Sequence, residues 1–274
     1  MSNLFDLTGK VSIVTGGNGG IGRAIAMGLA EHGSDIVIAA RNQEKTESVV
    51  KEILAMGRRC IGVQCDVLER KDIIKTVDTA VKELGKLNVL VNNAGIGQGG
   101  ELPQDVTSET WQNVIDINLT AQFVFSQIAY PALVKSGGGK IINMGSGYSL
   151  YAAGGNAPYA ASKAGLWNMT RSMALDWGKD NIQINLIVPG WIATEMTADV
   201  LAGEFGSPTT YPSHMVKGPI INKTAAGRIG EPEDLAGAGI FLASRASDFM
   251  TGSYIKVDGG VNAGDMAWPP SPAQ

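Results

Sequence analysis

Tyr159 and Lys163 stand four residues apart at the start of a predicted helix, so their phenol and ammonium groups lie on one face. A phenol with a pKa of about 10 is a poor base at neutral pH, but a nearby cation stabilises the phenolate and lowers that pKa. Ser146 ends a predicted strand thirteen residues earlier, where its hydroxyl could meet a substrate oxygen. These side chains suit proton transfer to an oxygen atom, although one such pair can arise by chance.

A glycine-rich loop, Thr15-Gly-Gly-Asn-Gly-Gly-Ile-Gly22, follows the first predicted strand and opens the first predicted helix. Glycines allow a tight turn close to a pyrophosphate, and the helix N-terminus offers unpaired N–H groups and a positive dipole end. With 36 glycines in the chain, the spacing alone is weak evidence, and the order strand, loop, helix carries the interpretation. The residues expected at the phosphates are Gly16, Asn18, Gly19, Gly20, Ile21 and Gly22.

The end of the second predicted strand indicates which dinucleotide fits. A site for NAD usually has an acidic residue there for the ribose hydroxyls, whereas a site for NADP has a basic one for the 2′-phosphate. Here the chain reads Ile-Ala-Ala-Arg41, without an acid, and a guanidinium can grip a phosphate with two hydrogen bonds. This favours NADP(H) over NAD(H). Alternatively, Arg41 covers the adenine or lies in solvent, and Glu44 is close by.

Composition excludes several other classes of protein. The net charge is −4, and no basic block or stripe suggests nucleic acid or an anionic membrane as a partner. No apolar stretch approaches the length of a membrane span, and no leader is visible, so a cytoplasmic protein is expected.

Cys60 and Cys65 lie five apart on a predicted strand, roughly 16 Å from each other, too far for a disulfide. His32 and His214 have no patterned partners, so no metal site is expected.

Short β-branched runs alternate with longer helical stretches along the chain. The runs at 89–92 and 141–144 are apolar at nearly every position, which is typical of parallel strands covered on both faces. Residues 1–274 are therefore expected to form one doubly wound α/β domain, a Rossmann-type seven-stranded parallel sheet with helices on both faces. The predicted strands are 11–15, 35–40, 60–65, 89–92, 140–144, 183–188 and 254–257, and the predicted helices are 21–32, 43–56, 69–84, 108–133, 159–177 and 233–243.

Two segments interrupt this alternation. Residues 190–226 are rich in glycine and proline and follow a strand at the edge where α/β proteins bind ligands, which predicts a substrate lid. An ordinary surface loop is the alternative. Residues 265–274 form a Pro-rich tail, expected to fray or to pack on a neighbouring subunit.

Taken together, the motifs resemble those of the short-chain dehydrogenase/reductase family in its compact single-domain branch. The resemblance runs from about Leu7 to Asn262 and depends on motifs in the family's order. They are Thr15-Gly-x-x-x-Gly-x-Gly22, Cys65-Asp-Val67, Asn92-Asn-Ala-Gly95, Asn118, Ser146, Tyr159-x-x-x-Lys163, Pro189-Gly-x-Ile-x-Thr194 and Val257-Asp-Gly-Gly260.

The resemblance implies a role for each of these positions. Tyr159 would donate or accept the proton, Lys163 would bind the nicotinamide ribose and lower the tyrosine pKa, and Ser146 would polarise the carbonyl. Asn118 would hold a water that links Lys163 to solvent. The remaining implied dinucleotide contacts are Asp66 and Val67 at the adenine, Asn93, Ala94 and Gly95 near the ribose, and Pro189, Gly190, Ile192 and Thr194 around the nicotinamide carboxamide. Taken singly, Ser146 and Asn118 could instead be ordinary caps.

The substrate is less well indicated. Expected pocket residues are apolar, aromatic or neutral, namely Ser146, Tyr148, Tyr151, Asn156, Trp191 and Met196. The closest resemblance is to 3-oxoacyl-carrier-protein reductases and gluconate 5-dehydrogenase-like enzymes. A sugar acid needs a cation, for which only His214 and Lys217 in the lid are available, and an acidic carrier protein needs a basic rim. A neutral ketone or secondary alcohol of modest size is therefore the preferred hypothesis.

Two other classes remain as alternatives. A nucleotide-sensing protein without turnover would not need all four catalytic residue types, and all four are present. Dehydratases and epimerases with the same pair usually carry a longer C-terminal substrate domain. The resemblance also implies a homotetramer or dimer, in which the predicted helices 108–133 and 159–177 form a shared bundle.

Overall fold

The protein is described by a computed structural model that covers residues 3–97, 100–152, 154–202 and 217–263. Within these residues, seven strands form one parallel sheet in the order β3-β2-β1-β4-β5-β6-β7, which confirms the predicted Rossmann-type fold. The strands are β1 (Val11–Thr15), β2 (Asp35–Ala40), β3 (Cys60–Gln64), β4 (Val89–Asn92), β5 (Gly139–Met144), β6 (Ile182–Pro189) and β7 (Tyr254–Val257).

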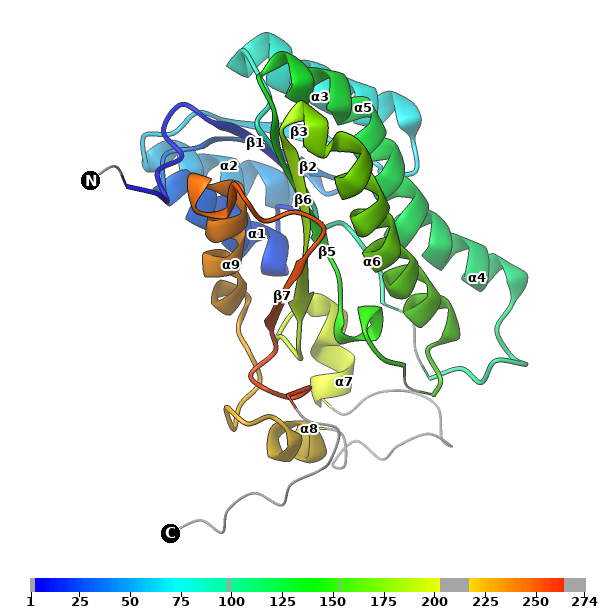
Figure 1. The fold of residues 1–274 in the computed structure, drawn as a ribbon. Helices are drawn as coiled ribbons and strands as arrows, with labels where there is room; N and C mark the ends of the chain where they lie inside the picture. Colours follow the sequence, from blue (N-terminus) through cyan, green and yellow to red (C-terminus); the bar gives the residue numbers. More distant parts are fainter. Residues whose placement is uncertain (1–2, 98–99, 153, 203–216, 264–274) are drawn as a thin grey trace.

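Helices cover both faces of this sheet, as Figure 1 shows. One face carries α1 (Gly20–Glu31), α2 (Gln43–Ala55) and α9 (Ala236–Ala243). The opposite face carries α3 (Arg70–Leu84), α4 (Ser108–Ile115), α5 (Ala121–Lys135) and α6 (Ala157–Trp177). Two short helices, α7 (Ala198–Ala202) and α8 (Lys217–Lys223), lie beyond the carboxyl end of the sheet.

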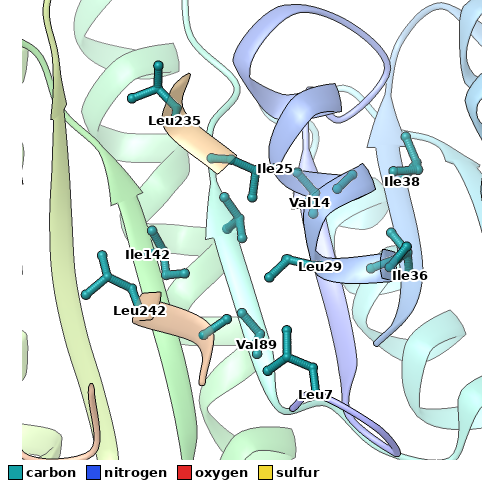
Figure 2. Close-up of a cluster of buried hydrophobic side chains, with 14 of the residues drawn as sticks. Leu7, Val14, Ile25, Leu29, Ile36, Ile38, Val89, Ile142, Leu235 and Leu242 are labelled. Atoms are coloured by element: carbon teal, nitrogen blue, oxygen red, sulfur yellow. The ribbon is translucent and has the colours of Figure 1, made fainter. Parts of the chain in front are cut away.

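Apolar side chains fill the space between the sheet and each layer of helices. Figure 2 shows the layer in which Ile25 and Leu29, one turn apart on α1, pack with Leu242 of α9 over the strands. The second layer packs the other face against α3, α5 and α6. Because β1 is covered on both sides, all five of its residues are buried. This explains the uninterrupted apolar runs, whereas the edge strand β7 has exposed and half-buried positions.

The strand order also decides where a ligand can bind. After β3 the chain crosses to β4 on the other side of β1, so the connections that follow β1 and β4 leave toward opposite faces. Such a reversal opens a crevice at the carboxyl ends of these strands, where doubly wound proteins bind ligands. The glycine loop follows β1 and the Asn-Asn-Ala-Gly motif ends β4, so both motifs meet at this crevice.

The structure divides the predicted helix 108–133 into two helices. A π-helical turn, Asp116–Thr120, separates α4 from α5, and Asn118 lies within it. A single wide turn barely disturbs the helical periodicity, so the sequence pattern did not reveal it. Smaller differences are that α6 begins at Ala157 and that Pro232–Leu235 forms a 3₁₀ turn ahead of α9.

Cys60 and Cys65 are buried and free, as their spacing predicts, and burial raises the pKa of Cys60 to about 12. Across the described ranges, no cluster of His, Cys, Asp and Glu could hold a metal ion, and no helix combines the length and apolarity needed to cross a membrane. Residues 203–216 of the predicted lid and the predicted tail 265–274 lie outside the described residues.

Candidate active site

A cavity of about 410 Å³ opens at the crevice beyond the carboxyl ends of β1, β4, β5 and β6. The glycine loop forms one side of it, and residues that follow β4, β5 and β6 form the others. Predicted dinucleotide residues line it, namely Gly16, Asn18, Gly19, Gly20, Ile21, Arg41, Asn93, Ala94, Gly95, Tyr159, Lys163, Pro189, Gly190, Ile192 and Thr194. The structure therefore brings together motifs from most of the chain's length.

The glycine loop needs glycine for two different reasons. Gly16 and Gly20 have φ angles of 63° and 48°, in the left-handed region that favours glycine. Gly22 instead lies behind the loop, because a Cβ there would stand 2.3 Å from Gly16 O and 2.4 Å from Asn93 Nδ2. Asn93 Nδ2 donates to Thr15 O at 2.9 Å. Gly22 thus supports the loop from behind and does not line the cavity, unlike its predicted role at the phosphates.

A second cavity, of about 630 Å³, adjoins the first at the ends of β2 and β3. Arg41, Asp66 and Val67, the residues predicted at the adenosine, all line it. Arg41 is exposed and lines both cavities. The Asp66 carboxylate accepts a hydrogen bond from Leu68 N at 3.0 Å, which holds the turn after β3 in place. The two cavities together are lined by most of the residues predicted to bind a dinucleotide.

Asn18 has a positioning role that the sequence pattern did not reveal. Its Nδ2 donates to Asn42 O and to Thr46 Oγ1, both at 3.1 Å. Asn42 in turn caps α2, since its side chain accepts from Lys45 N at 2.9 Å. The glycine loop and the start of α2 are therefore joined by one hydrogen-bonded network.

The predicted proton-transfer residues meet on the far side of the first cavity. Tyr159 and Lys163 project from the first turns of α6, and Ser146 caps a short 3₁₀ turn after β5. The Ser146 side chain is close enough to the Tyr159 phenol to lower the pKa of Tyr159 in part. The Lys163 ammonium lies 5.6 Å from the centre of the Tyr159 ring and donates to Met144 O at 2.8 Å. These three side chains form the cluster that their sequence positions predict.

The pKa of Tyr159 differs from the sequence-based expectation. Burial raises it to about 12, and the Ser146 side chain offsets only part of this rise. Burial also lowers the pKa of Lys163 to about 8. Exclusion of water penalises both charged forms, and the ammonium contacts a neutral carbonyl rather than the phenol oxygen. In the protein by itself, burial therefore outweighs the effect of the neighbouring cation.

Asn118 lies at the wide turn between α4 and α5 and is fully buried. Its Oδ1 accepts from Ile96 N at 2.8 Å, and its Nδ2 donates to Ile96 O at 2.9 Å. A Cβ on Gly95 would stand 3.0 Å from Asn118 Oδ1 and 3.8 Å from Lys163 Nζ, so all three meet at this point. The π-helical turn places Asn118 beside Lys163, while its predicted role in holding water stays a prediction.

The segment after β6 forms the remaining wall of the first cavity. Gly190 packs so closely that an added Cβ would stand 2.7 Å from Asp258 Cα, which ties this segment to the end of β7. Ile192 is 4% exposed, and Thr194 caps the 3₁₀ turn Glu195–Thr197. The Thr194 methyl lies 3.2 Å from the position of a Cβ on Gly20, directly opposite the glycine loop. The first cavity is therefore narrow between the loop and Thr194.

A third cavity, of about 560 Å³, opens beyond the proton-transfer residues. All six predicted substrate residues line it, namely Ser146, Tyr148, Tyr151, Asn156, Trp191 and Met196. Asp199 and Val200, which lie within the predicted lid 190–226, also line it, and so does Val261, which no local pattern marks. This cavity and the first share Ser146, Tyr159, Pro189, Gly190, Met196 and Thr197. Ser146 and Tyr159 therefore lie where the first and the third cavity meet.

Aromatic rings form much of this third cavity. The Tyr148 ring lies 5.6 Å from Tyr151 and meets Tyr159 edge-on, also at 5.6 Å between centres. Gly147 makes this possible, since a Cβ there would stand 2.3 Å from the Tyr151 hydroxyl. Val261, near the end of the described chain, lines the same cavity as Tyr151. The loop after β5 and the residues after β7 therefore line one cavity.

The family model of the short chain dehydrogenases matches residues 10–204. The chain belongs to this family. Gluconate 5-dehydrogenase from Gluconobacter oxydans (strain 621H) is 36% identical over 259 residues, which cover 94% of this chain and 97% of the relative. As a short-chain dehydrogenase, the protein is an oxidoreductase that interconverts a ketone and a secondary alcohol with a nicotinamide dinucleotide.

Two solved structures of this family share its fold. A gluconate 5-dehydrogenase from Burkholderia cenocepacia J2315, in complex with NADP and tartrate, has a TM-score of 0.86 and 33% identity. A 7α-hydroxysteroid dehydrogenase, complexed with NADH and 7-oxo glycochenodeoxycholic acid, has a TM-score of 0.86 and 32% identity. In both comparisons, the matched region covers 95% of this short-chain dehydrogenase and 98% of the solved chain. These two similar structures thus differ in both cofactor and type of substrate.

Proposed function

We propose that this protein reduces a neutral ketone, and oxidises the corresponding secondary alcohol, with Tyr159 as the proton donor and acceptor. One observation carries the proposal: Ser146 and Tyr159 line both the first and the third cavity. A carbonyl in the third cavity would meet both hydroxyls while its carbon faces the first cavity. That is the geometry needed for a reaction between two bound molecules.

The roles of the side chains follow from this geometry. When bound, the reduced dinucleotide supplies the hydride. As negative charge develops on the carbonyl oxygen, Ser146 and Tyr159 each donate a hydrogen bond to it, and Tyr159 then transfers its proton. The protonated amine of Lys163 comes from one helical turn beyond Tyr159, and Asn118 lies beside this amine. In alcohol oxidation, Tyr159 must first lose its proton.

NADP(H) is the proposed dinucleotide. The last two residues of β2 are Ala39 and Ala40, so no carboxylate stands there to bind both ribose hydroxyls. Arg41 follows at once, is exposed and lines the cavity expected to receive the adenosine. A guanidinium at that place favours a 2′-phosphate.

The preference for a neutral substrate rests on the charge of the third cavity. Of its described lining residues, Asp199 alone carries a formal charge, and that charge is negative. A sugar-acid carboxylate placed there would be repelled by Asp199 and would lack an ion-pair partner among these residues. The two cations considered from the sequence, His214 and the Lys217 side chain, lie outside what the structure describes.

The similarity to a gluconate 5-dehydrogenase favours a second candidate, oxidation of a sugar acid. A panel of kcat/KM values with NADPH would decide between the two, using neutral cyclic and aromatic ketones beside 5-keto-D-gluconate. We expect higher kcat/KM for a neutral ketone, and a clear preference for 5-keto-D-gluconate would refute that choice. Consumption of NADPH in step with ketone would also distinguish an enzyme from a nucleotide sensor.

Replacing Tyr159 by Phe tests the proton-transfer role directly. The phenyl ring keeps the packing against Tyr148 but removes the hydroxyl, so kcat should fall by about 10²-fold or more. The affinity for dinucleotide, measured by calorimetry, should stay within about twofold of the wild type. Wild-type turnover by this variant would contradict the proposed mechanism.

We also propose that the protein is a homo-oligomer in the cytoplasm. Large apolar side chains are exposed on the helices of one face, with Trp111 on α4, Phe123 on α5 and Leu175 on α6 at 42%, 41% and 86%. A partner subunit would cover such residues. Buried free thiols at Cys60 and Cys65 suit a reducing compartment. Light scattering would show a dimer or tetramer, and a monomer at micromolar concentration would refute the assembly.

A further inference from the structure

An ion pair spans the opening of the dinucleotide cleft. Lys45, in the first turn of α2, places its Nζ 2.5 Å from Oε1 of Glu195, in the turn that follows Thr194. The two residues are 150 positions apart in the chain and come from opposite sides of the cleft. Both line the 630 Å³ cavity, and Glu195 lines the 410 Å³ cavity as well. The pair therefore bridges the region in which the two cavities adjoin.

The two side chains reach across this opening and are not packed into the protein. Their exposures are 49% for Lys45 and 88% for Glu195. An ion pair so exposed to water contributes little to stability and is exchanged easily for another partner. The backbones beneath are held firmly, since Asn42 caps the first turn of α2 and Thr194 forms a capping box with Thr197. The side chains can therefore change partners without rearrangement of the fold.

We propose that Lys45 is a specificity residue that binds the 2′-phosphate of NADP(H) together with Arg41, and that Glu195 competes with that phosphate for the ammonium. This inference rests on the proposed function, because it assumes that the adenosine lies beside Arg41. Arg41 and Lys45 line the same cavity. A phosphate near neutral pH carries close to twice the charge of a carboxylate, so it attracts the ammonium more strongly at equal distance.

The two dinucleotides would consequently meet different sites. NADP(H) would draw Lys45 away from Glu195 and gain a second cation beside Arg41. NAD(H) has an uncharged ribose hydroxyl at this position, so Lys45 would stay paired with Glu195. The negative charge of Glu195 opposes the bound phosphate, so Glu195 limits the preference that Lys45 creates.

Calorimetric titration tests this without any need for turnover. The ligands are NADP⁺, NAD⁺ and 2′,5′-ADP, which carries the 2′-phosphate but no nicotinamide. Lys45→Met should weaken binding of NADP⁺ and 2′,5′-ADP about fivefold, while NAD⁺ changes by less than about twofold. Glu195→Gln should tighten binding of NADP⁺ and 2′,5′-ADP about twofold. In a Lys45→Met background this gain should shrink, because the competition has been removed.

Lys51→Met is the matched control, since Lys51 is also exposed and lies on α2 two turns from Lys45. It should leave all three affinities unchanged. Equal losses of NADP⁺ and NAD⁺ binding in Lys45→Met, or no loss of either, would overturn the inference. Dinucleotide binding with the expected Lys45 effect but without ketone turnover would refute the proposed function alone. Binding of neither dinucleotide by the wild type would refute both.

Discussion

Replacing Lys163 by Met should stabilise the fold while it removes activity. Lys163 is 4% exposed, and its ammonium donates to a neutral carbonyl, Met144 O, at 2.8 Å. Burial lowers its pKa from 10.5 to about 8. A pKa lowered by this much corresponds to a cost of about 3 kcal/mol for keeping the charged form in the folded state. Methionine has a similar length and carries no charge.

The net gain is smaller than this cost, because the variant also loses one hydrogen bond. Its loss destabilises by about 1 kcal/mol, which leaves a gain of about 2 kcal/mol in the free energy of unfolding at pH 7. For a chain of this size, such a gain raises Tm by about 3–4 °C. Urea denaturation of wild type and Lys163→Met, followed by circular dichroism, measures the difference.

The pH dependence of this gain gives a sharper test. Below about pH 8, Lys163 is charged in both the folded and the unfolded wild type, so the full cost is present. Between about pH 8 and the unfolded value of 10.5, the folded protein has lost the proton and the unfolded chain has not. Wild-type stability therefore rises relative to the variant over this window, and the gain should fade.

Lys140→Met is the matched control, because this second buried lysine does have a carboxylate partner. Its Nζ donates to Asp248 at 2.8 Å, so its removal loses an ion pair together with the buried charge. We expect no gain in stability from this variant. The reasoning about Lys163 would be refuted if Lys163→Met were less stable than wild type at pH 7, or if its gain persisted above pH 10.5.

Two further predictions concern the loop and the phenol. Gly22→Ala puts a Cβ 2.3 Å from Gly16 O, so calorimetry should show dinucleotide affinity reduced by about tenfold or more, and an unchanged Kd would contradict the supporting role of Gly22. Because burial raises the pKa of Tyr159 to about 12, kcat for alcohol oxidation, which needs the phenolate, should rise from pH 7 to pH 10. Ketone reduction uses the phenol, so its kcat should not rise over this range, and a flat oxidation profile would contradict this reasoning.

Much of the site was predictable because its motifs lie at the ends of buried strands. Apolar runs such as Val89–Asn92 identify parallel strands, and the carboxyl ends of parallel strands share one edge of the sheet. Residues just after such runs, including Ser146 and the loop from Gly16, were therefore expected to meet. The structure does bring them to one cavity. Family resemblance added Asn118, which no local pattern marks.

Other features depend on contacts between distant segments. The π-helical turn at Asn118 keeps the helical periodicity, so only the packing of its amide against Ile96 identifies it. Val261 lines the third cavity from a segment that the pattern does not connect with Tyr159. Lys45 and Glu195 meet across 150 residues, and nothing in either local sequence predicts that contact.

The sequence by itself determined the order of strands and helices, the strand ends that carry chemistry, and the types of side chain available there. These follow from hydrophobic periodicity and motif spacing, which are local properties of the chain. Only the tertiary structure decided the ionisation of those side chains and the shape of the spaces between them. The reason is that a pKa depends on how completely distant segments exclude water. Burial therefore raises the pKa of Tyr159 although Lys163 lies one helical turn away.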